Sequence, residues 1–360
     1  MDKMFDPPLP NIPLSTELEY QTPALHEETQ SMHAENNIDE SSDSTASNNA
    51  LSSASVASQQ SKFWSQNVDN NMPPSILSKL SPLSENEVKM FTPLVSKKYF
   101  VSNPKLCTTA NLVCSVAVKP LPPSNIQYTH FTDKVYVPME QVHPASLFRL
   151  SVIKKGHEVT LPTNLDRELP NRSFLPPQIA RHIALSASEL QRIFPTAFSI
   201  PMTKAAMQLS LSHCDAPIVK GERRGCLKTL EDMIQFSRES LGSKHLVALA
   251  SDYTKGVGNQ VFMIGNVKPY KTNKVVACHE MFFPFATYYC HKLPSTQIYA
   301  VDVVNPNRIG ATNKMFVICH MDTSAWAPDH VAFKLLKLSP GKGEVCHWIT
   351  QMDLIWIGYD

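Results

Sequence analysis

Residues 278–291 read CHEMFFPFATYYCH, and this pattern decides how the second half of the chain folds. A Cys-His dipeptide stands at each end, and most residues between them are apolar or aromatic, which favours buried strands. Two more such dipeptides follow, so the four are Cys278-His279, Cys290-His291, Cys319-His320 and Cys346-His347. Neighbouring side chains on a strand point to opposite faces. Each cysteine is therefore expected on the opposite side of its strand from the histidine that follows it.

This alternation predicts different chemistry for the two residue types. Four cysteines on one face would form two disulfides, although thiolate metal ligands or free buried thiols would also fit. On the other face the imidazoles could converge, and imidazole clusters suit copper or zinc. The candidate metal ligands are His279, His291, His320 and His347; the alternative is that they are satisfied histidines that hold the region together. Asp322, two residues after His320, could orient a histidine or could form a turn.

The other four cysteines lie outside these dipeptides. Cys107 and Cys114 are close in sequence, which favours a local disulfide, with two unrelated thiols as the alternative. Cys214 and Cys226 flank the loop KGERRG, and a disulfide between them would pin two predicted helices together. Eight cysteines permit about 105 pairings, so the sequence leaves the full connectivity open.

Helix signals precede the Cys-His region, and strand signals surround it. Ser186 and Glu189 form a capping box, Thr203 is an expected cap of a second helix, and Thr229 opens a third that Gly242 ends. Short runs rich in β-branched and aromatic residues then alternate with turn-formers, at residues 261–264, 275–277, 298–301 and 315–318. The predicted fold class is α+β. Helices of the first half of the domain pack on a mainly antiparallel sheet of its second half, with disulfides stabilising it.

Composition divides the chain into three zones. Residues 1–60 are rich in Ser and Asn and cannot bury enough apolar surface, so this segment is predicted to be disordered. Residues 61–145 form a leader and linker, in which a capping box at residues 84–87 predicts a short helix. β-Branched residues and prolines between residues 101 and 137 suggest loops and edge strands. Residues 146–360 are predicted to form one continuous domain.

Charge and motifs argue against several functional classes. The chain has 33 basic and 32 acidic residues, which gives no electrostatic reason for nucleic-acid or membrane-surface binding. No apolar stretch approaches the roughly 20 residues that span a bilayer, so no membrane insertion is expected. The chain contains no G-x-S-x-G or H-E-x-x-H motif, and hydrolysis is therefore poorly supported.

The spacing CH-x10-CH-x27-CH-x25-CH resembles the defining motif of the BURP family, which is confined to plants. Segments such as RSFLPPQIA at residues 172–180 and GEVCHWI at residues 343–349 are similar to family segments, and the resemblance covers residues 146–360. Residues 62–91 also resemble the leader of one branch, the non-catalytic beta subunit of polygalacturonase.

Two departures from that branch stand out. Its members carry F-x-x-Y repeats between leader and BURP domain, and this chain has none there. Its members also begin with a secretory signal, whereas residues 1–20 contain acidic residues and prolines where an apolar region should lie. We interpret this start as an alternative or misassigned one, or as the mark of a relative that has changed compartment.

The resemblance implies a secreted protein of the plant cell wall, or apoplast. Its expected role is a non-catalytic component that associates with pectin or polygalacturonase, in development or in stress responses. The sequon at Asn171 would then make it a glycoprotein. Some BURP proteins are copper-dependent peptide cyclases, so the alternative is such an enzyme acting on a separate peptide, with copper at the four histidines. The third possibility is a stable secreted module without further activity.

Overall fold

The leader folds into four helices in a computed structural model that describes residues 55–97, 104–115, 144–166, 168–252, 256–306 and 312–359. These helices are α1 (Val56–Asn67), α2 (Pro74–Leu77), α3 (Glu85–Ser96) and α4 (Pro104–Thr109). The predicted capping box is present, because Ser84 and Glu87 exchange hydrogen bonds at the start of α3. Helix α1 begins inside the segment of residues 1–60 that was predicted to be disordered; the part up to residue 54 lies outside the described residues, as do residues 116–143 of the linker.

Six further helices follow in the described residues, and two of the three caps predicted for this region are confirmed. The helices are α5 (Pro177–Ala180), α6 (Ala187–Ile193), α7 (Pro195–Ser199), α8 (Pro201–Cys214) and α9 (Leu230–Leu241), with α10 (Val331–Leu336) near the end of the chain. Ser186 caps α6 and Thr229 caps α9, which ends at Gly242 in the left-handed conformation. The prediction of Thr203 as a cap is wrong. Helix α8 begins at Pro201, whose fixed φ suits the first helical position, and Thr203 is buried inside it.

The strands form two antiparallel five-stranded sheets, where the sequence had suggested one. The first has the order β1 (Glu158–Thr160), β4 (Val261–Pro269), β7 (Thr296–Val304), β8 (Thr312–His320), β9 (Val345–Ile349). The second has the order β2 (Arg223–Leu227), β6 (Thr287–Lys292), β5 (Val275–Met281), β10 (Leu354–Tyr359), β3 (His245–Leu249). The predicted α+β class is confirmed, and strands dominate its C-terminal half. None of the helices in the described ranges is both long and apolar enough to cross a bilayer.

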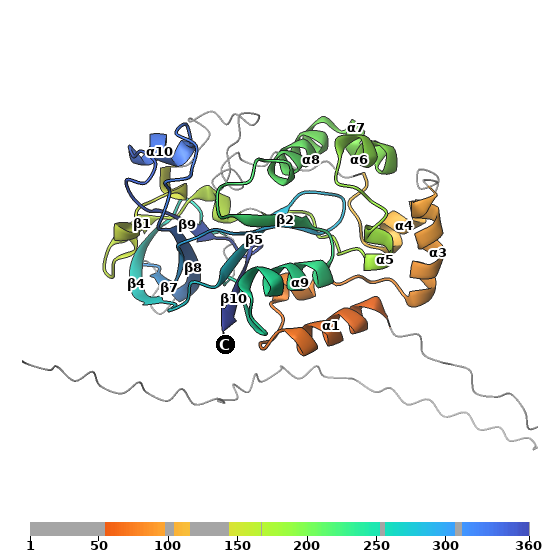
Figure 1. Cartoon of the computed structure of the whole chain (residues 1–360), viewed down its shortest axis with the longest axis horizontal. Helices are drawn as coiled ribbons and strands as arrows, with labels where there is room; N and C mark the ends of the chain where they lie inside the picture. Colours follow the sequence, from red (N-terminus) through yellow and green to blue (C-terminus); the bar gives the residue numbers. More distant parts are fainter. Residues whose placement is uncertain are drawn as a thin grey trace, which may run out of the picture. The chain divides into compact units, whose positions relative to one another are not determined.

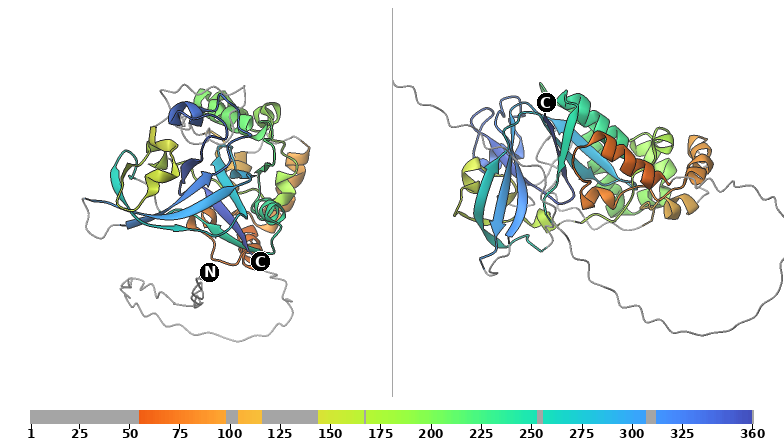
Figure 2. Two further views of the ribbon diagram at one scale, coloured as in Figure 1. Left: turned by 60° about the vertical axis from the view of Figure 1, so that its left-hand side comes forward. Right: turned by 90° about the horizontal axis from the view of Figure 1, so that it is seen from below.

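The two sheets face each other across an apolar layer. Side chains from β5 and β10 of the second sheet meet side chains from β7, β8 and β9 of the first, including Ala277, Ile318 and Ile349. The outer face of the second sheet is covered by α9 and the leader. Figure 1 shows α1 and α9 side by side close to β10. In the right-hand view of Figure 2 the orange leader helices and the green helices lie together on one side of the strands.

The leader belongs to the same hydrophobic core as the residues after 146. Trp64 of α1 is 3% exposed and its ring lies 5.4 Å from that of Trp356 in β10. Phe91 of α3 shares a second cluster with Phe285, which follows β5. Burying an aromatic side chain of this size contributes roughly 2 to 3 kcal/mol. The described part of the leader therefore packs within the same unit as the residues after 146, and the domain boundary at residue 145 stays a prediction.

Candidate functional site

The four histidines of the Cys-His dipeptides come together between the two sheets. Their ring centroids form a closed circuit, with 5.5 Å from His279 to His291, 6.1 Å from His291 to His320, 5.6 Å from His320 to His347 and 5.8 Å from His347 to His279. All four side chains are buried. The four imidazole rings therefore lie next to one another, as the sequence suggested they could.

The sheet register explains this convergence. Cys278 of β5 pairs with Cys290 of β6, so the histidines one residue further along each strand lie diagonally across the pair, on the opposite face. Cys319 of β8 and Cys346 of β9 repeat the arrangement in the first sheet. Because the histidine-bearing faces of the two sheets look at each other, two diagonal pairs make one cluster.

All eight cysteines form disulfides, and none is free. The bonds are Cys107–Cys114, Cys214–Cys226, Cys278–Cys290 and Cys319–Cys346. The first two are the local bonds that the sequence favoured. The last two do not share one face as expected. Each lies on the outer side of its own sheet, in a separate apolar cluster, because the sequence places two dipeptides in each sheet.

Every histidine of the cluster turns its Nδ1 atom towards a group that can accept a hydrogen bond. His279 Nδ1 lies 3.4 Å from Asp353 Oδ1, and His291 Nδ1 lies 3.8 Å from Glu222 Oε1. His347 Nδ1 lies 3.2 Å from the carbonyl oxygen of Trp348.

The fourth contact joins His320 Nδ1 to the hydroxyl oxygen of Thr296, at 3.5 Å. The Thr296 hydroxyl donates its proton to the carbonyl oxygen of Leu293, so only its lone pairs face the ring. Each ring thus has a hydrogen-bond acceptor on its Nδ1 side, an arrangement compatible with the tautomer that carries the proton on Nδ1 and the lone pair on Nε2. A neutral imidazole with a free Nε2 lone pair is the form that binds a metal.

The donor set suits copper or zinc, although the rings stand slightly apart. The Nε2 atoms of His279 and His347 are buried and have no hydrogen-bond partner. Metal–imidazole bonds are roughly 2.0 Å long. Within the described residues, no three His, Cys, Asp or Glu side chains are placed to hold an ion as they stand. An ion would have to draw the rings inward, and the metal site stays a prediction.

Electrostatics keep at least one of these rings neutral. Burial, together with the smaller effect of the nearby His279, lowers the pKa of His347 to about 4. Burial opposes ionisation of Asp353, but His279 and the hydrogen bonds of Thr350 outweigh it, so the pKa of Asp353 is lowered. The cluster therefore combines the neutral imidazole of His347 with the ionised carboxylate of Asp353, which contacts the neighbouring His279.

Asp322, the acid singled out from the sequence, does not reach the cluster. It is exposed and accepts a hydrogen bond from the backbone N–H of Ser324 at 2.9 Å, which makes it a turn residue. The acids that contact the histidines, Asp353 and Glu222, were missed. Asp353 precedes β10 and reaches His279 because β10 pairs with β5, whereas Glu222 lies in the loop closed by Cys214–Cys226. The KGERRG loop had been noticed only for its flanking cysteines.

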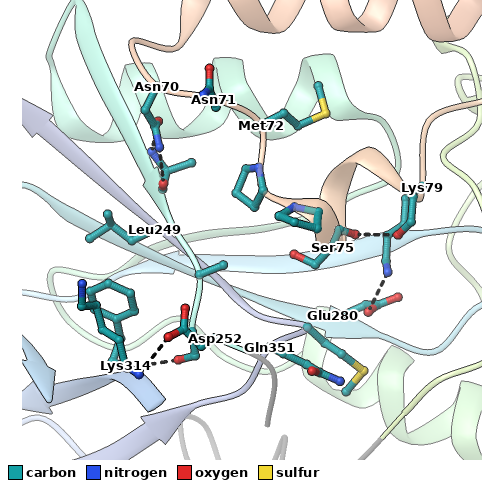
Figure 3. Close-up of a pocket in the computed structure, with 18 of the residues that line it drawn as sticks. Asn70, Asn71, Met72, Ser75, Lys79, Leu249, Asp252, Glu280, Lys314 and Gln351 are labelled. Atoms are coloured by element: carbon teal, nitrogen blue, oxygen red, sulfur yellow. Dashed lines mark hydrogen bonds and ion pairs between the residues drawn. The ribbon is translucent and has the colours of Figure 1, made fainter. Parts of the chain in front are cut away.

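A groove with a volume of about 1080 Å³ lies elsewhere on the molecule (Figure 3). Leader residues 70–79 form one wall, and residues 248–252 at the end of β3 form another. Lys79 and Glu280 form an ion pair of 3.4 Å at one end. Glu280 follows His279 on β5, so it lies on the opposite face of that strand, and none of the four histidines lines the groove.

The predicted glycosylation residue lies beside this groove. Asn171 is exposed and lines it, while Ser173 of the same sequon is buried and accepts a hydrogen bond from the Asn111 side chain at 3.1 Å. Glycosylation of Asn171 remains a prediction.

Two disulfide-bonded antiparallel sheets that enclose four Cys-His histidines define a domain of the BURP type. The BURP domain profile matches residues 146–358, and the chain belongs to that family. It is 38% identical over 221 residues to polygalacturonase-1 non-catalytic subunit beta of Solanum lycopersicum, which covers 60% of this chain and 34% of that protein. It is 35% identical over 221 residues to polygalacturonase 1 beta-like protein 1 of Arabidopsis thaliana, covering 60% and 35%.

These relatives place the chain in the polygalacturonase beta-subunit-like branch of this plant family, so the resemblance inferred from the sequence is confirmed. The alignments span about a third of the length of the tomato and Arabidopsis proteins. A longer match, 29% identical over 318 residues, is to BURP domain-containing protein 16 of Oryza sativa subsp. japonica, covering 82% of this chain and 88% of that protein.

Proposed function

We propose that this chain is a non-catalytic component of the plant cell wall that associates with polygalacturonase or with pectin. The observation that carries the proposal is its 38% identity to a tomato protein named as a non-catalytic subunit of polygalacturonase. The aligned segment is only about a third of that protein, so the association would have to reside within it. A role in development or stress responses would follow from wall association.

An extracellular location fits the cysteine chemistry. All eight cysteines are paired, and disulfides persist in oxidising compartments rather than in the cytosol. Secretion would also expose Asn171 to glycosylation. Expression of a fluorescent fusion in plant cells, with and without the first 54 residues, tests the location. Fluorescence that stays in the cytosol with both versions would argue against the wall.

Binding assays test the association directly. The full chain, purified from a secretory host, is incubated with immobilised pectin and, in a separate assay, with purified polygalacturonase. Binding to at least one of them supports the proposal, and binding to neither contradicts it. Ala250→Trp would fill the groove between leader and sheet, whereas Ile218→Ser changes a residue that is 67% exposed outside the groove. A loss confined to Ala250→Trp would place the contact in the groove.

The histidine cluster favours a second candidate, a copper-binding protein that acts as a cyclase on a separate peptide. His279, His291, His320 and His347 would hold the ion through Nε2, because their Nδ1 atoms face other acceptors. Bound copper would supply one-electron oxidation. The chain's own residues keep the His347 imidazole neutral, and all four rings are buried away from bulk water.

Mass spectrometry tests this second candidate. A cross-link between an aromatic side chain and another position of a peptide removes two hydrogens, with dioxygen as the oxidant. The copper-loaded protein is incubated in air with tyrosine- and tryptophan-containing peptides. A mass loss of two hydrogens that requires the four histidines supports the cyclase. Copper binding without any such product would leave a metal-binding, non-catalytic protein.

A further inference from the structure

Two carboxylates from outside the Cys-His dipeptides face the Nδ1 atoms of two of the four histidines. Asp353 contacts His279, and Glu222 contacts His291. These two histidines belong to the second sheet, whereas the contacts of His320 and His347 are to a hydroxyl and to a backbone carbonyl. These two carboxylate contacts thus fall on the histidines of the second sheet.

Asp353 is held in one orientation by its other hydrogen bonds. Its Oδ2 atom accepts from the backbone N–H of Thr350 at 3.1 Å and from the Thr350 hydroxyl at 2.9 Å. Its Oδ1 atom accepts from the backbone N–H of Glu280 at 3.3 Å, and the same oxygen faces His279 Nδ1. These hydrogen bonds to Thr350 and Glu280 fix the orientation of the Asp353 carboxylate independently of its contact with His279.

Glu222 is held in a comparable way by the loop that Cys214–Cys226 closes. Its Oε2 atom accepts from the backbone N–H of Val219 at 3.0 Å. Its Oε1 atom accepts from the Tyr289 hydroxyl at 3.2 Å and faces His291 Nδ1. The Tyr289 ring also lies 5.4 Å from the His291 ring.

We propose that Asp353 and Glu222 are positioning residues of the metal site, which hold His279 and His291 with Nδ1 protonated and Nε2 directed at the ion. The inference rests on the copper binding proposed above. Both carboxyl groups accept hydrogen bonds from their other neighbours, and a carboxylate oxygen that faces Nδ1 favours the tautomer with the proton on Nδ1. Such carboxylate–histidine contacts orient metal ligands, and their loss typically lowers metal affinity roughly 10- to 100-fold.

The geometry predicts what an amide would do in place of Asp353. Thr350 offers two donors to Oδ2, whereas Oδ1 accepts only the longer bond from the Glu280 N–H at 3.3 Å. In Asp353→Asn the amide oxygen would therefore take the Oδ2 position, and the Glu280 bond would be lost. The amide nitrogen would then stand at the Oδ1 position and point a proton at His279 Nδ1. His279 would switch to the tautomer with the proton on Nε2, which blocks coordination. Glu222→Gln acts on His291 by the same principle.

Copper affinity of the full chain tests the proposal. Wild type, Asp353→Asn, Glu222→Gln and the control Asp322→Asn are purified metal-free and titrated with Cu²⁺ against a competing chelator. The control removes a carboxylate charge close to His320 in sequence, but from an exposed turn that does not touch the cluster. Copper electron paramagnetic resonance reports the number of bound nitrogens, and thermal unfolding of the metal-free proteins reports folding separately.

We expect the two cluster variants to bind copper about 10- to 100-fold more weakly than wild type, and the control within about twofold. Wild type that binds no copper would overturn the proposed copper function itself. Wild type that binds copper, with both variants binding equally well, would overturn only the positioning role.

Histidine nitrogen NMR of the metal-free wild type decides the matter even if a variant fails to fold. The proposal requires His279 and His291 to carry the proton on Nδ1. A proton on Nε2 of either ring would contradict the positioning role of its carboxylate.

Discussion

The two faces of the strands that carry the Cys-His dipeptides differ in how many of their reactive and polar atoms have a bonding partner. On the outer sides, Cys278–Cys290 and Cys319–Cys346 are closed by covalent bonds inside apolar clusters. On the inner sides, the Nε2 atoms of His279 and His347 are buried without a hydrogen-bond partner. Buried polar atoms without partners are rare and costly. The cysteines are thus closed by covalent bonds, whereas His279 and His347 keep an unpartnered Nε2 atom, and the proposed metal site would make use of it.

Removing either disulfide of the Cys-His dipeptides should have the largest effect on the free energy of unfolding. Replacing Cys319 and Cys346 with Ala opens a bond between residues 27 apart, and loop entropy predicts a loss of about 3.5 kcal/mol. The same change at Cys278 and Cys290, which are 12 residues apart, should cost about 2.8 kcal/mol. Urea unfolding measures both losses. Variants as stable as wild type would show that these bonds are not structural.

The histidine side should make the metal-free protein sensitive to acid. The pKa of His347 is about 4 in the folded protein and near 6.5 when exposed on unfolding. Between these values the unfolded chain binds a proton that the folded chain does not, so stability is lost as the pH falls from 6.5 towards 4. The loss should reach roughly 3 kcal/mol.

Urea unfolding at pH 7 and pH 4.5 measures this loss, and His347→Gln provides the comparison. The pH dependence should shrink in the variant. An identical pH dependence in both proteins would mean that His347 is not held neutral by the cluster.

A smaller effect is expected at the hydroxyl behind His320. Thr296→Val removes the acceptor of His320 Nδ1 and the donor to the Leu293 carbonyl. The loss of stability should be about 1 kcal/mol. Because a neutral hydroxyl orients a histidine less strongly than a carboxylate, copper affinity should fall less than in Asp353→Asn. A fall as large as that in Asp353→Asn would show that charge does not distinguish the two contacts.

Local signals allowed much of the fold to be predicted. The caps at Ser84, Ser186 and Thr229 depend on residues three positions away, and all three are present. The opposition of cysteine and histidine on a strand follows from its period of two, whereas the meeting of the four imidazoles also depends on the register and facing of the two sheets. Thr203 failed as a cap because two residues earlier Pro201 offers a better helix start.

Features set by contacts between distant segments could not be predicted. The partition of the strands into two sheets, and hence the separation of the two outer disulfides, depends on the register of strands far apart in sequence. Asp353 reaches His279 through the pairing of β10 with β5, which the spacing of residues along the sequence does not predict. Trp64 likewise joins the core by packing on Trp356, so the leader had been treated as separate from the domain.

Copper content is the most direct test of the contrast between the two sides. The full chain from a secretory host is loaded with copper, dialysed and analysed by elemental mass spectrometry, beside a variant with His279, His291, His320 and His347 all changed to Ala. Circular dichroism in the aromatic region checks that the variant is folded. We predict about one copper per chain in the parent and none in the variant. A folded parent without copper, or a variant that keeps it, would contradict a histidine metal site.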